Sequence, residues 1–274
     1  MKVYISADLE GISGMVSWDQ MKEGTPEYEK AVDLMLKEVN AAVVGALKGG
    51  ASEVIVNDSH GYMRNLPIEG LHRQARLISG FIKPLSMVEG VEEADLAFFI
   101  GYHAGVGTKA SICDHSYSSS SVFRLRINGV DYSETAINAA VCGYFRVPVG
   151  LVTGDRETVK QAKAFLAGVL TVETKIGISR FAAACRHPLE VRQEIEEKAQ
   201  AALSKFKEGG FQALCVEAPV DLEVTFTQTG KADVAELLPG TERLDGRTVH
   251  YRGKDILEAF RVLQALLLLA RSVS

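Results

Sequence analysis

Three short apolar runs of the chain each end in side chains that commonly bind divalent metal ions. They are residues 2–7, followed by Asp8 and Glu10; residues 53–57, followed by His60; and residues 96–102, followed by His103. We predict that these runs are parallel strands of one sheet, where ligand sites form outside the carboxyl ends of the strands. Carboxylate oxygens combined with imidazole suit zinc or a similar divalent ion. The joint pattern favours one metal site over unrelated structural residues.

A fourth candidate, His115, lies in an irregular stretch just before a run of serines. The sequence leaves three roles open for it: a further metal ligand, a general base, or a surface histidine on a loop. Cys113 suggests a Cys/His nucleophilic pair, but a spacing of two residues is weak support, because such partners usually meet through the fold. The remaining histidines lack a strand-end setting and are interpreted as structural; they are His72, His187 and His250.

The pattern around these residues predicts alternating strands and helices. The clearest helix covers 26–48, where Thr25 can cap the start, Pro26 fits the first turn and two glycines follow the end. We also expect a strand at 149–153, a hairpin at 122–132 around Asn128-Gly129, and a helix at 134–144. Short apolar strands separated by helices indicate an α/β fold, with a mostly parallel central sheet covered by helices on both faces.

After residue 186 the pattern changes. We expect a polar amphipathic helix at 188–206, strands near 213–216 and 222–227, a hairpin at Asp245-Gly246, and an apolar helix from Asp255. Residues 1–186 are therefore predicted to form an α/β metal-binding catalytic domain. Residues 187–274 are predicted to form a smaller C-terminal α+β lobe packed on it.

Composition narrows the functional classes. A chain of 274 residues can bury about 75% of its surface without metal or disulfide support, so metal ligands are expected to serve function. The net charge of −5 and the mixing of charges provide no basic stripe, which excludes nucleic acid as the expected partner. The apolar segment between Arg261 and Arg271 is too short to span a membrane, no secretion signal is visible, and four separated cysteines suit reduced thiols. We expect a cytoplasmic protein.

Short motifs also occur in a characteristic order along nearly the whole chain. They are Ser6-Ala7-Asp8-Leu9-Glu10-Gly11-Ile12-Ser13-Gly14, Asn57-Asp58-Ser59-His60, Gly80 with Lys83-Pro84 and Met87-Val88-Glu89-Gly90, Gly101-Tyr102-His103-Ala104, Asp114-His115-Ser116, and Ser133-Glu134 with Asn138-Ala139. This ordered set resembles the D-aminopeptidase family of zinc peptidases (peptidase family M55). Two positions depart from the family pattern: Lys109-Ala110 replaces a frequent Pro-Gly, and Ser133 replaces the glycine that usually precedes the glutamate.

The resemblance implies a cytoplasmic zinc aminopeptidase that hydrolyses short peptides with N-terminal D-residues, such as D-Ala-D-Ala. By position, it assigns metal ligation to five residues: Asp8, Glu10, His60, His103 and Glu134. It assigns a catalytic role to His115, and Glu134 enters through the resemblance alone. The family pattern further implies two zinc ions per subunit, Asp8 as their bridge, and a ring-like decamer whose inner chamber admits small peptides.

If zinc is bound at that site, a metal-activated water can attack the peptide carbonyl, and His115 can move a proton to the departing amine. Asp58 and Asp114 are candidates for orienting the neighbouring imidazoles. Three alternatives stay open: a metal-dependent amidohydrolase, an L-specific peptidase, or a non-catalytic ligand-binding α/β module.

Overall fold

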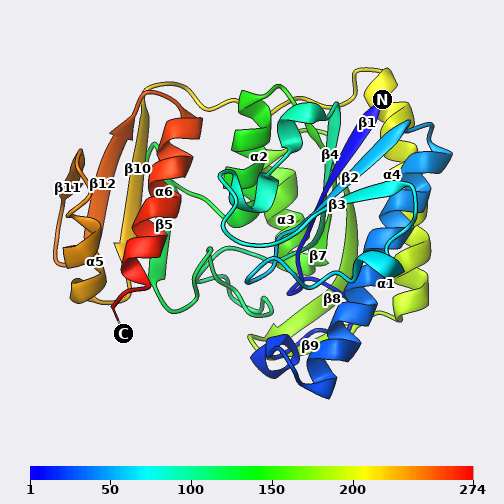
Figure 1. Cartoon of the computed structure of the whole chain (residues 1–274), viewed down its shortest axis with the longest axis horizontal. Coiled ribbons are helices and arrows are strands. Elements are labelled where there is room, and N and C mark those ends of the chain that lie inside the picture. The colour runs from blue at the N-terminus through cyan, green and yellow to red at the C-terminus, as the bar shows by residue number, and fades with distance from the viewer. Residues whose placement is uncertain (274) are drawn as a thin grey trace.

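A computed structural model describes residues 1–273 of the chain. The larger of its two sheets has seven strands and belongs to the lobe that carries the N-terminus (Figure 1). Its strand order is β3 (Ala75–Ile78), β2 (Glu53–Asp58), β1 (Lys2–Ala7), β4 (Leu96–Tyr102), β7 (Val149–Asp155), β8 (Leu170–Ser179) and β9 (Ala182–Cys185). Neighbouring strands are parallel except β8 and β9, which pair antiparallel. The predicted mostly parallel central sheet is confirmed.

Helices cover both faces of this sheet. Because successive side chains of a strand point to opposite faces, Val3 and Ile5 join the core under α1 (Pro26–Lys48) and α4 (Pro188–Lys207). Tyr4 and Phe99 join the opposite core with residues of α2 (Glu134–Tyr144) and α3 (Arg156–Phe165). The two cores hold the strand ends in fixed register.

The predicted bounds of two helices that flank the site are confirmed. Helix α1 begins after Thr25, whose hydroxyl accepts a hydrogen bond from the Tyr28 amide at 3.2 Å. Helix α2 begins after Ser133, whose hydroxyl accepts from the Ala136 amide at 3.3 Å. This cap places Glu134 in the first turn of α2, beside the carboxyl ends of the strands.

A second, antiparallel sheet forms the other lobe of the molecule (Figure 1, left). Its strand order is β11 (Thr241–Arg243), β12 (Thr248–Gly253), β10 (Val220–Phe226), β5 (Val122–Ile127) and β6 (Val130–Asp131). Asn128 and Gly129 join β5 to β6 with positive φ angles of 49° and 76°, as the predicted turn requires. Helix α6 (Ile256–Ala270), capped by Asp255, packs against this sheet, α2 and α5 (Thr229–Ala235).

The two lobes do not correspond to two consecutive stretches of the sequence. β5 and β6 precede residue 186 yet belong to the second sheet, whereas α4 follows residue 186 yet packs on α1. The division at residue 186 stays a prediction. The expected strand at 213–216 was wrong, because this segment runs as irregular chain without a ladder partner among residues 1–273. The predicted hairpin at Asp245-Gly246 is confirmed, because β11 and β12 pair antiparallel on either side of it. The sequence pattern did not predict β3, β8, β9, α3 or α5.

Short 3-10 turns shape the loops near the strand ends; they are η1 (Trp18–Met21), η2 (Ile68–Gly70), η3 (Ser86–Val88) and η4 (Val91–Glu93). In the part of the chain that the structure describes, no helix combines the length and apolar character needed to cross a membrane.

Candidate metal centre

The structure brings the candidate ligands from three strand ends and one helix start together. Three groups of side chains each hold ligand atoms within 4.8 Å of one another: Asp8, Glu10 and His60; Asp8, His103 and Glu134; and Glu10, His103 and His115. The first two groups share Asp8. This arrangement has the form of two neighbouring cation sites joined by one carboxylate.

The distances within the first two groups are short. His60 Nδ1 lies 3.3 Å from Asp8 Oδ1 and 3.0 Å from Glu10 Oε2. His103 Nε2 lies 3.2 Å from Glu134 Oε1 and 3.7 Å from Asp8 Oδ2. Each imidazole therefore has carboxylate oxygens from two different elements beside a nitrogen that can bind a metal.

Two buried atoms of the cluster lack a hydrogen-bond partner and are suited to bind a metal ion. Asp8 Oδ2 and His103 Nε2 are buried, and neither has a hydrogen-bond partner within residues 1–273. His103 Nδ1 lies 3.0 Å from the Ala104 carbonyl, to which it can donate its proton and so leave Nε2 with a free lone pair. A divalent cation between the carboxylate and the imidazole would satisfy both, so the donor set fits a metal site.

The cluster has unusual electrostatics because its side chains are buried. Burial, together with the charge of Glu10, raises the pKa of Asp8 to about 8. Burial also disfavours the charged form of Glu10, but His60 more than offsets it and holds the pKa of Glu10 well below its usual range. Burial disfavours charge on His103 as well, yet Glu134 raises the pKa of His103 to about 10. Without metal, the neutral form of Asp8 is therefore favoured, while the charges of Glu10 and Glu134 are stabilised by His60 and His103.

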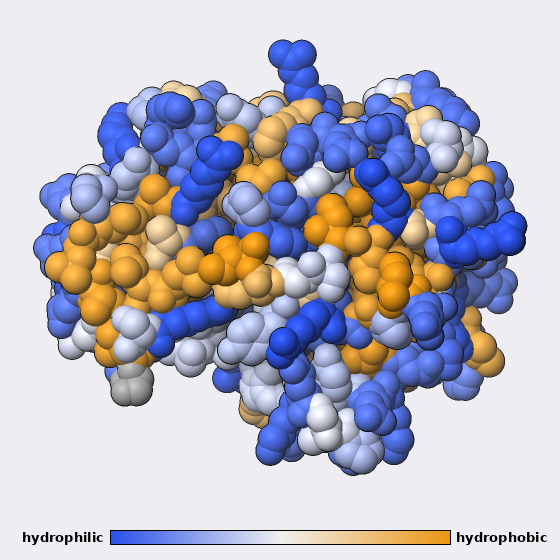
Figure 2. All heavy atoms as spheres, viewed as in Figure 1, coloured by the Kyte–Doolittle hydropathy of each residue, from blue (hydrophilic) through white to orange (hydrophobic). Residues whose placement is uncertain are grey.

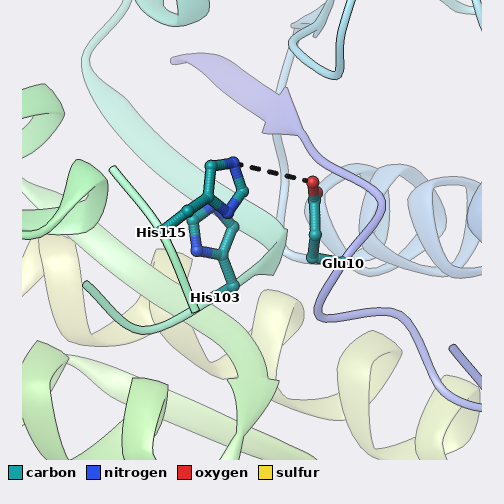
Figure 3. A group of neighbouring side chains, drawn as sticks. All are labelled: Glu10, His103 and His115. Atoms are coloured by element: carbon teal, nitrogen blue, oxygen red, sulfur yellow. Dashed lines mark ion pairs between the residues drawn. The ribbon is translucent and has the colours of Figure 1, made fainter. Parts of the chain in front are cut away.

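His115 lies directly beside this cluster (Figure 3). Its ring stacks on that of His103, with centroids 4.0 Å apart and planes 9° apart. His115 Nε2 is 3.8 Å from Glu10 Oε1 and 3.7 Å from Glu134 Oε1, while Nδ1 lies 2.9 Å from the Cys113 carbonyl. Burial and the neighbouring His103 lower the pKa of His115, which favours its neutral form. Of the three roles left open for His115, that of a surface histidine is excluded, because the residue is buried.

A cavity of about 160 Å³ opens over the cluster. Its lining includes Asp8, Glu10, His60, His115 and Glu134. Residues of the 81–87 loop and of the last helix, α6, also line it. The cluster can therefore be reached by a small molecule.

Comparison with known proteins decides the family. Residues 1–265 match the family model described as D-aminopeptidase, of peptidase family M55. The chain is 38% identical to the D-aminopeptidase of Bacillus subtilis strain 168, across 100% of this chain and 99% of the relative. It is also similar to the solved structure of the Zn-dependent D-aminopeptidase DppA from Bacillus subtilis, described as a self-compartmentalizing protease. That similarity has a TM-score of 0.95 at 38% identity and covers 100% of this chain and 99% of that one.

The chain belongs to the D-aminopeptidase family. It is therefore a peptidase, a hydrolase that acts on peptide bonds. The six clustered side chains all lie inside the matched region.

In this chain, the loop that carries Asp8 and Glu10 is held by a buried lysine that sequence reasoning missed. Lys175, on β8, is fully buried, and its Nζ donates to the carbonyls of Glu10, Ile12 and Met15 at 2.6, 2.8 and 2.7 Å. Burial lowers the pKa of Lys175 to about 8. Three carbonyl acceptors match the three protons of an ammonium group, so Lys175 fixes the path of the ligand loop.

The same loop needs glycine where it passes the end of β4. A Cβ on Gly11 would lie 1.9 Å from the Tyr102 carbonyl oxygen, and the Gly11 amide donates to the Gly101 carbonyl at 2.7 Å. Gly101 has a φ of 75°, a conformation that glycine adopts readily. Close approach of these two backbones sets the distance between the Asp8 loop and His103.

Asp58 and Asp114, the candidates for orienting imidazoles, have other hydrogen-bond partners. Asp58 accepts hydrogen bonds from the amides of Asn65 and Leu66 and so shapes the loop after His60. Asp114 accepts from the Gly107 amide and pairs with Arg180 at 2.9 Å. Both predictions were wrong, because these two carboxylates are engaged by other groups and neither contacts an imidazole nitrogen.

The other histidines have local partners instead of places in the cluster. His72 Nδ1 accepts from the Gln74 amide, and His187 Nδ1 accepts from the Leu189 amide at the start of α4. His250 Nε2 lies 3.0 Å from Asp221 Oδ1. Their interpretation as structural is consistent with these contacts.

Proposed function

We propose that the protein is a zinc-dependent aminopeptidase that removes N-terminal D-residues from short peptides, with D-Ala-D-Ala as a representative substrate. The observation that carries this proposal is the pair of three-residue groups that share Asp8. Family membership and the similarity to a structure described as a Zn-dependent D-aminopeptidase support zinc as the metal.

In this proposal each subunit holds two zinc ions, with Asp8 between them. Glu10 and His60 complete one site, and His103 and Glu134 complete the other. Zinc bound there lowers the pKa of a coordinated water towards neutrality and polarises a peptide carbonyl. The orphaned Asp8 Oδ2 and His103 Nε2 are the atoms that support this assignment most directly.

His115 is proposed as the group that moves protons during hydrolysis. Its neutral form is favoured by burial and by His103, so Nε2 can accept a proton from the attacking water and pass it to the departing amine. Its Nδ1 donates to the Cys113 carbonyl, which keeps Nε2 directed at the cluster. Because a metal-activated water supplies the nucleophile, no covalent intermediate on the protein is needed.

The substrate's amino group is expected at the cluster. Asp8, Glu10 and Glu134 are each 3% exposed there, and zinc held by them would bind the neutral amine and so orient the substrate. This orientation favours removal of the first residue of a peptide over cleavage within a long chain.

The decisive test compares matched alanyl dipeptides on zinc-loaded protein. We expect hydrolysis of D-Ala-D-Ala at a higher kcat/KM than L-Ala-L-Ala, and about two equivalents of zinc per subunit by metal analysis. Preference for the L-peptide would overturn the stereochemical assignment. Hydrolysis of neither peptide, with zinc bound, would overturn the substrate class.

We also propose that the subunits assemble into a ring-like decamer in the cytoplasm. The similarity to a structure described as a self-compartmentalizing protease supports assembly, and buried free thiols at Cys113 and Cys142 suit a reducing compartment. A decamer of the 29.7 kDa subunit has a mass of about 297 kDa, which light scattering after size-exclusion chromatography can measure. A monomer mass at working concentration would contradict the assembly.

A further inference from the structure

One face of the last helix also lines the cavity that opens over the cluster. Helix α6 and the residue after it contribute four lining side chains, Gln264, Leu267, Leu268 and Arg271. Their spacing of three, four and seven residues places them along one side of a helix. Figure 2 shows hydrophobic residues gathered over the lobe that carries α6. The polar members of this wall are Gln264 and Arg271.

Gln264 offers the cavity a hydrogen-bond donor. Its Nε2 is buried and has no hydrogen-bond partner among residues 1–273. A buried donor without a partner is destabilising, so such a group is usually explained by something that binds it. The position of Gln264 in the cavity wall makes a bound ligand the natural acceptor.

Arg271 offers the cavity an unneutralised positive charge. Within the described chain, its guanidinium forms no ion pair and rests 5.3 Å from the centroid of the Phe81 ring, which holds it by a cation–π contact. The chain after it turns towards α5, where Lys231 Nζ binds the carbonyls of Ala270 and Val273 at 3.1 and 2.8 Å. The guanidinium is thus left at the cavity with free N–H groups.

The other ammonium group in the wall is already engaged. Lys83 is 8% exposed, and its Nζ donates to Asn57 Oδ1 at 2.5 Å and to the Asp58 carbonyl at 2.6 Å. It therefore holds β2 and the 81–87 loop together. Arg271 is the better candidate to receive an anion, because a guanidinium binds a carboxylate through two parallel hydrogen bonds.

We propose that Arg271 binds the free C-terminal carboxylate of a short peptide substrate and that Gln264 donates to one of its backbone carbonyls. The inference rests on the proposed function, because it places the peptide amino group at the metal cluster. An amine-binding metal site and a guanidinium in the same cavity then orient the peptide in one direction. Because the cluster and Arg271 line one cavity of about 160 Å³, the site selects short peptides with free carboxyl ends.

The test compares D-Ala-D-Ala with its C-terminal amide, which lacks the negative charge. We expect the wild-type enzyme to favour the free acid in kcat/KM by about 10- to 100-fold, the range of a charge-assisted hydrogen bond. In Arg271→Gln this ratio falls to about one, and Arg271→Lys, which keeps the charge without the two-pronged geometry, gives an intermediate ratio. Gln264→Leu lowers kcat/KM for both peptides alike, since both carry the backbone carbonyl.

The matched control is Arg261→Gln, which removes an exposed arginine from the same helix without touching the cavity. We expect it to preserve the wild-type ratio. The inference is overturned if the wild-type enzyme does not distinguish acid from amide, or if Arg271→Gln keeps the wild-type ratio. Failure of the proposed function has a different signature, because the wild-type enzyme would then hydrolyse neither D-peptide.

Discussion

The parallel stacking of His103 and His115 places two imidazoles with opposite tendencies against one another. Their ring centroids are 4.0 Å apart, yet Glu134 raises the pKa of His103 while burial and His103 itself lower the pKa of His115. Two like charges at this distance disfavour each other, so one ring carries the positive character and the other stays neutral. The stack therefore separates an electrostatic role for His103 from a proton-transfer role for His115.

Replacement of His115 by alanine should separate catalysis from metal binding. We expect kcat to fall by about 10²- to 10⁴-fold, the usual contribution of a positioned acid or base, while zinc content stays at the wild-type level. Steady-state kinetics and metal analysis on the same sample measure both. His72→Ala is the control, since His72 lies outside the cluster. Loss of one zinc ion from His115→Ala would identify this histidine as a ligand, as the group of Glu10, His103 and His115 also allows.

Zinc binding should release protons near neutral pH. In the metal-free protein the pKa of Asp8 is about 8 and that of His103 about 10, so at pH 7 both groups are largely protonated. Metal ligands must give up these protons, so zinc affinity should rise with pH between about 6 and 8. Calorimetric titration in two buffers with different ionisation enthalpies measures the release. A binding heat that is the same in both buffers would contradict it.

The raised pKa of Asp8 also predicts how the stability of the metal-free protein changes with pH. The pKa of Asp8 is raised from 3.8 to about 8 on folding, so between these values the folded state holds more protons than the unfolded chain. The contribution of Asp8 to stability is therefore present below pH 4 and is lost as pH rises to about 8. Urea unfolding of chelator-treated protein at several pH values should show this decline, and Asp8→Asn should reduce it.

Loss of the Lys175 ammonium should destabilise the fold as well as the site. Lys175→Met leaves the carbonyls of Glu10, Ile12 and Met15 without their donor, and we expect the free energy of unfolding to fall by about 2–4 kcal/mol. Lys37→Met, which removes an exposed pair with Asp33, should cost less than about 1 kcal/mol. Urea denaturation compares the two variants. Equal effects would mean that the three buried hydrogen bonds do not hold the loop.

The free thiols provide a test of the Cys/His alternative. Burial raises the pKa of Cys113 to about 12, and its backbone carbonyl, not its thiol, faces His115. A thiol with this pKa is a poor nucleophile at neutral pH. We expect iodoacetamide to label the exposed Cys185 and Cys215 and to spare Cys113 and Cys142 in the folded protein. Cys113→Ser should keep peptidase activity, whereas its loss, with metal retained, would revive the nucleophile hypothesis.

The sequence predicted the candidate ligands that follow strands and missed side chains whose role depends on tertiary packing. Four candidate ligands could be predicted because apolar strands indicate where their carboxyl ends lie; they are Asp8, Glu10, His60 and His103. Glu134 begins a helix after the hairpin of the second sheet, so no strand-end argument reaches it, and family resemblance supplied it instead.

Lys175 and Gln264 show the same limit. Lys175 lies on β8, whose residues 171–175 mix threonine, valine, glutamate and lysine and do not read as a buried strand. Gln264 is one polar residue in an apolar helix. It gains a role only because the helix packs over a cavity whose other walls come from residues more than a hundred positions earlier in the sequence. Long-range placement of single side chains cannot be obtained from local pattern.

Chelation should abolish activity while the subunit stays folded. The two hydrophobic cores on either face of the central sheet contain none of the proposed ligands, so metal removal leaves their packing intact. In the cluster, His60 and His103 keep carboxylate partners at 3.0 and 3.2 Å, which limits repulsion among the carboxylates. We expect EDTA to eliminate hydrolysis of D-Ala-D-Ala, to lower the melting temperature by several degrees through loss of ligand linkage, and to leave the far-ultraviolet circular dichroism at 25 °C unchanged. Added zinc should restore activity without a refolding step. Unfolding on chelation would instead show that the metal is part of the scaffold.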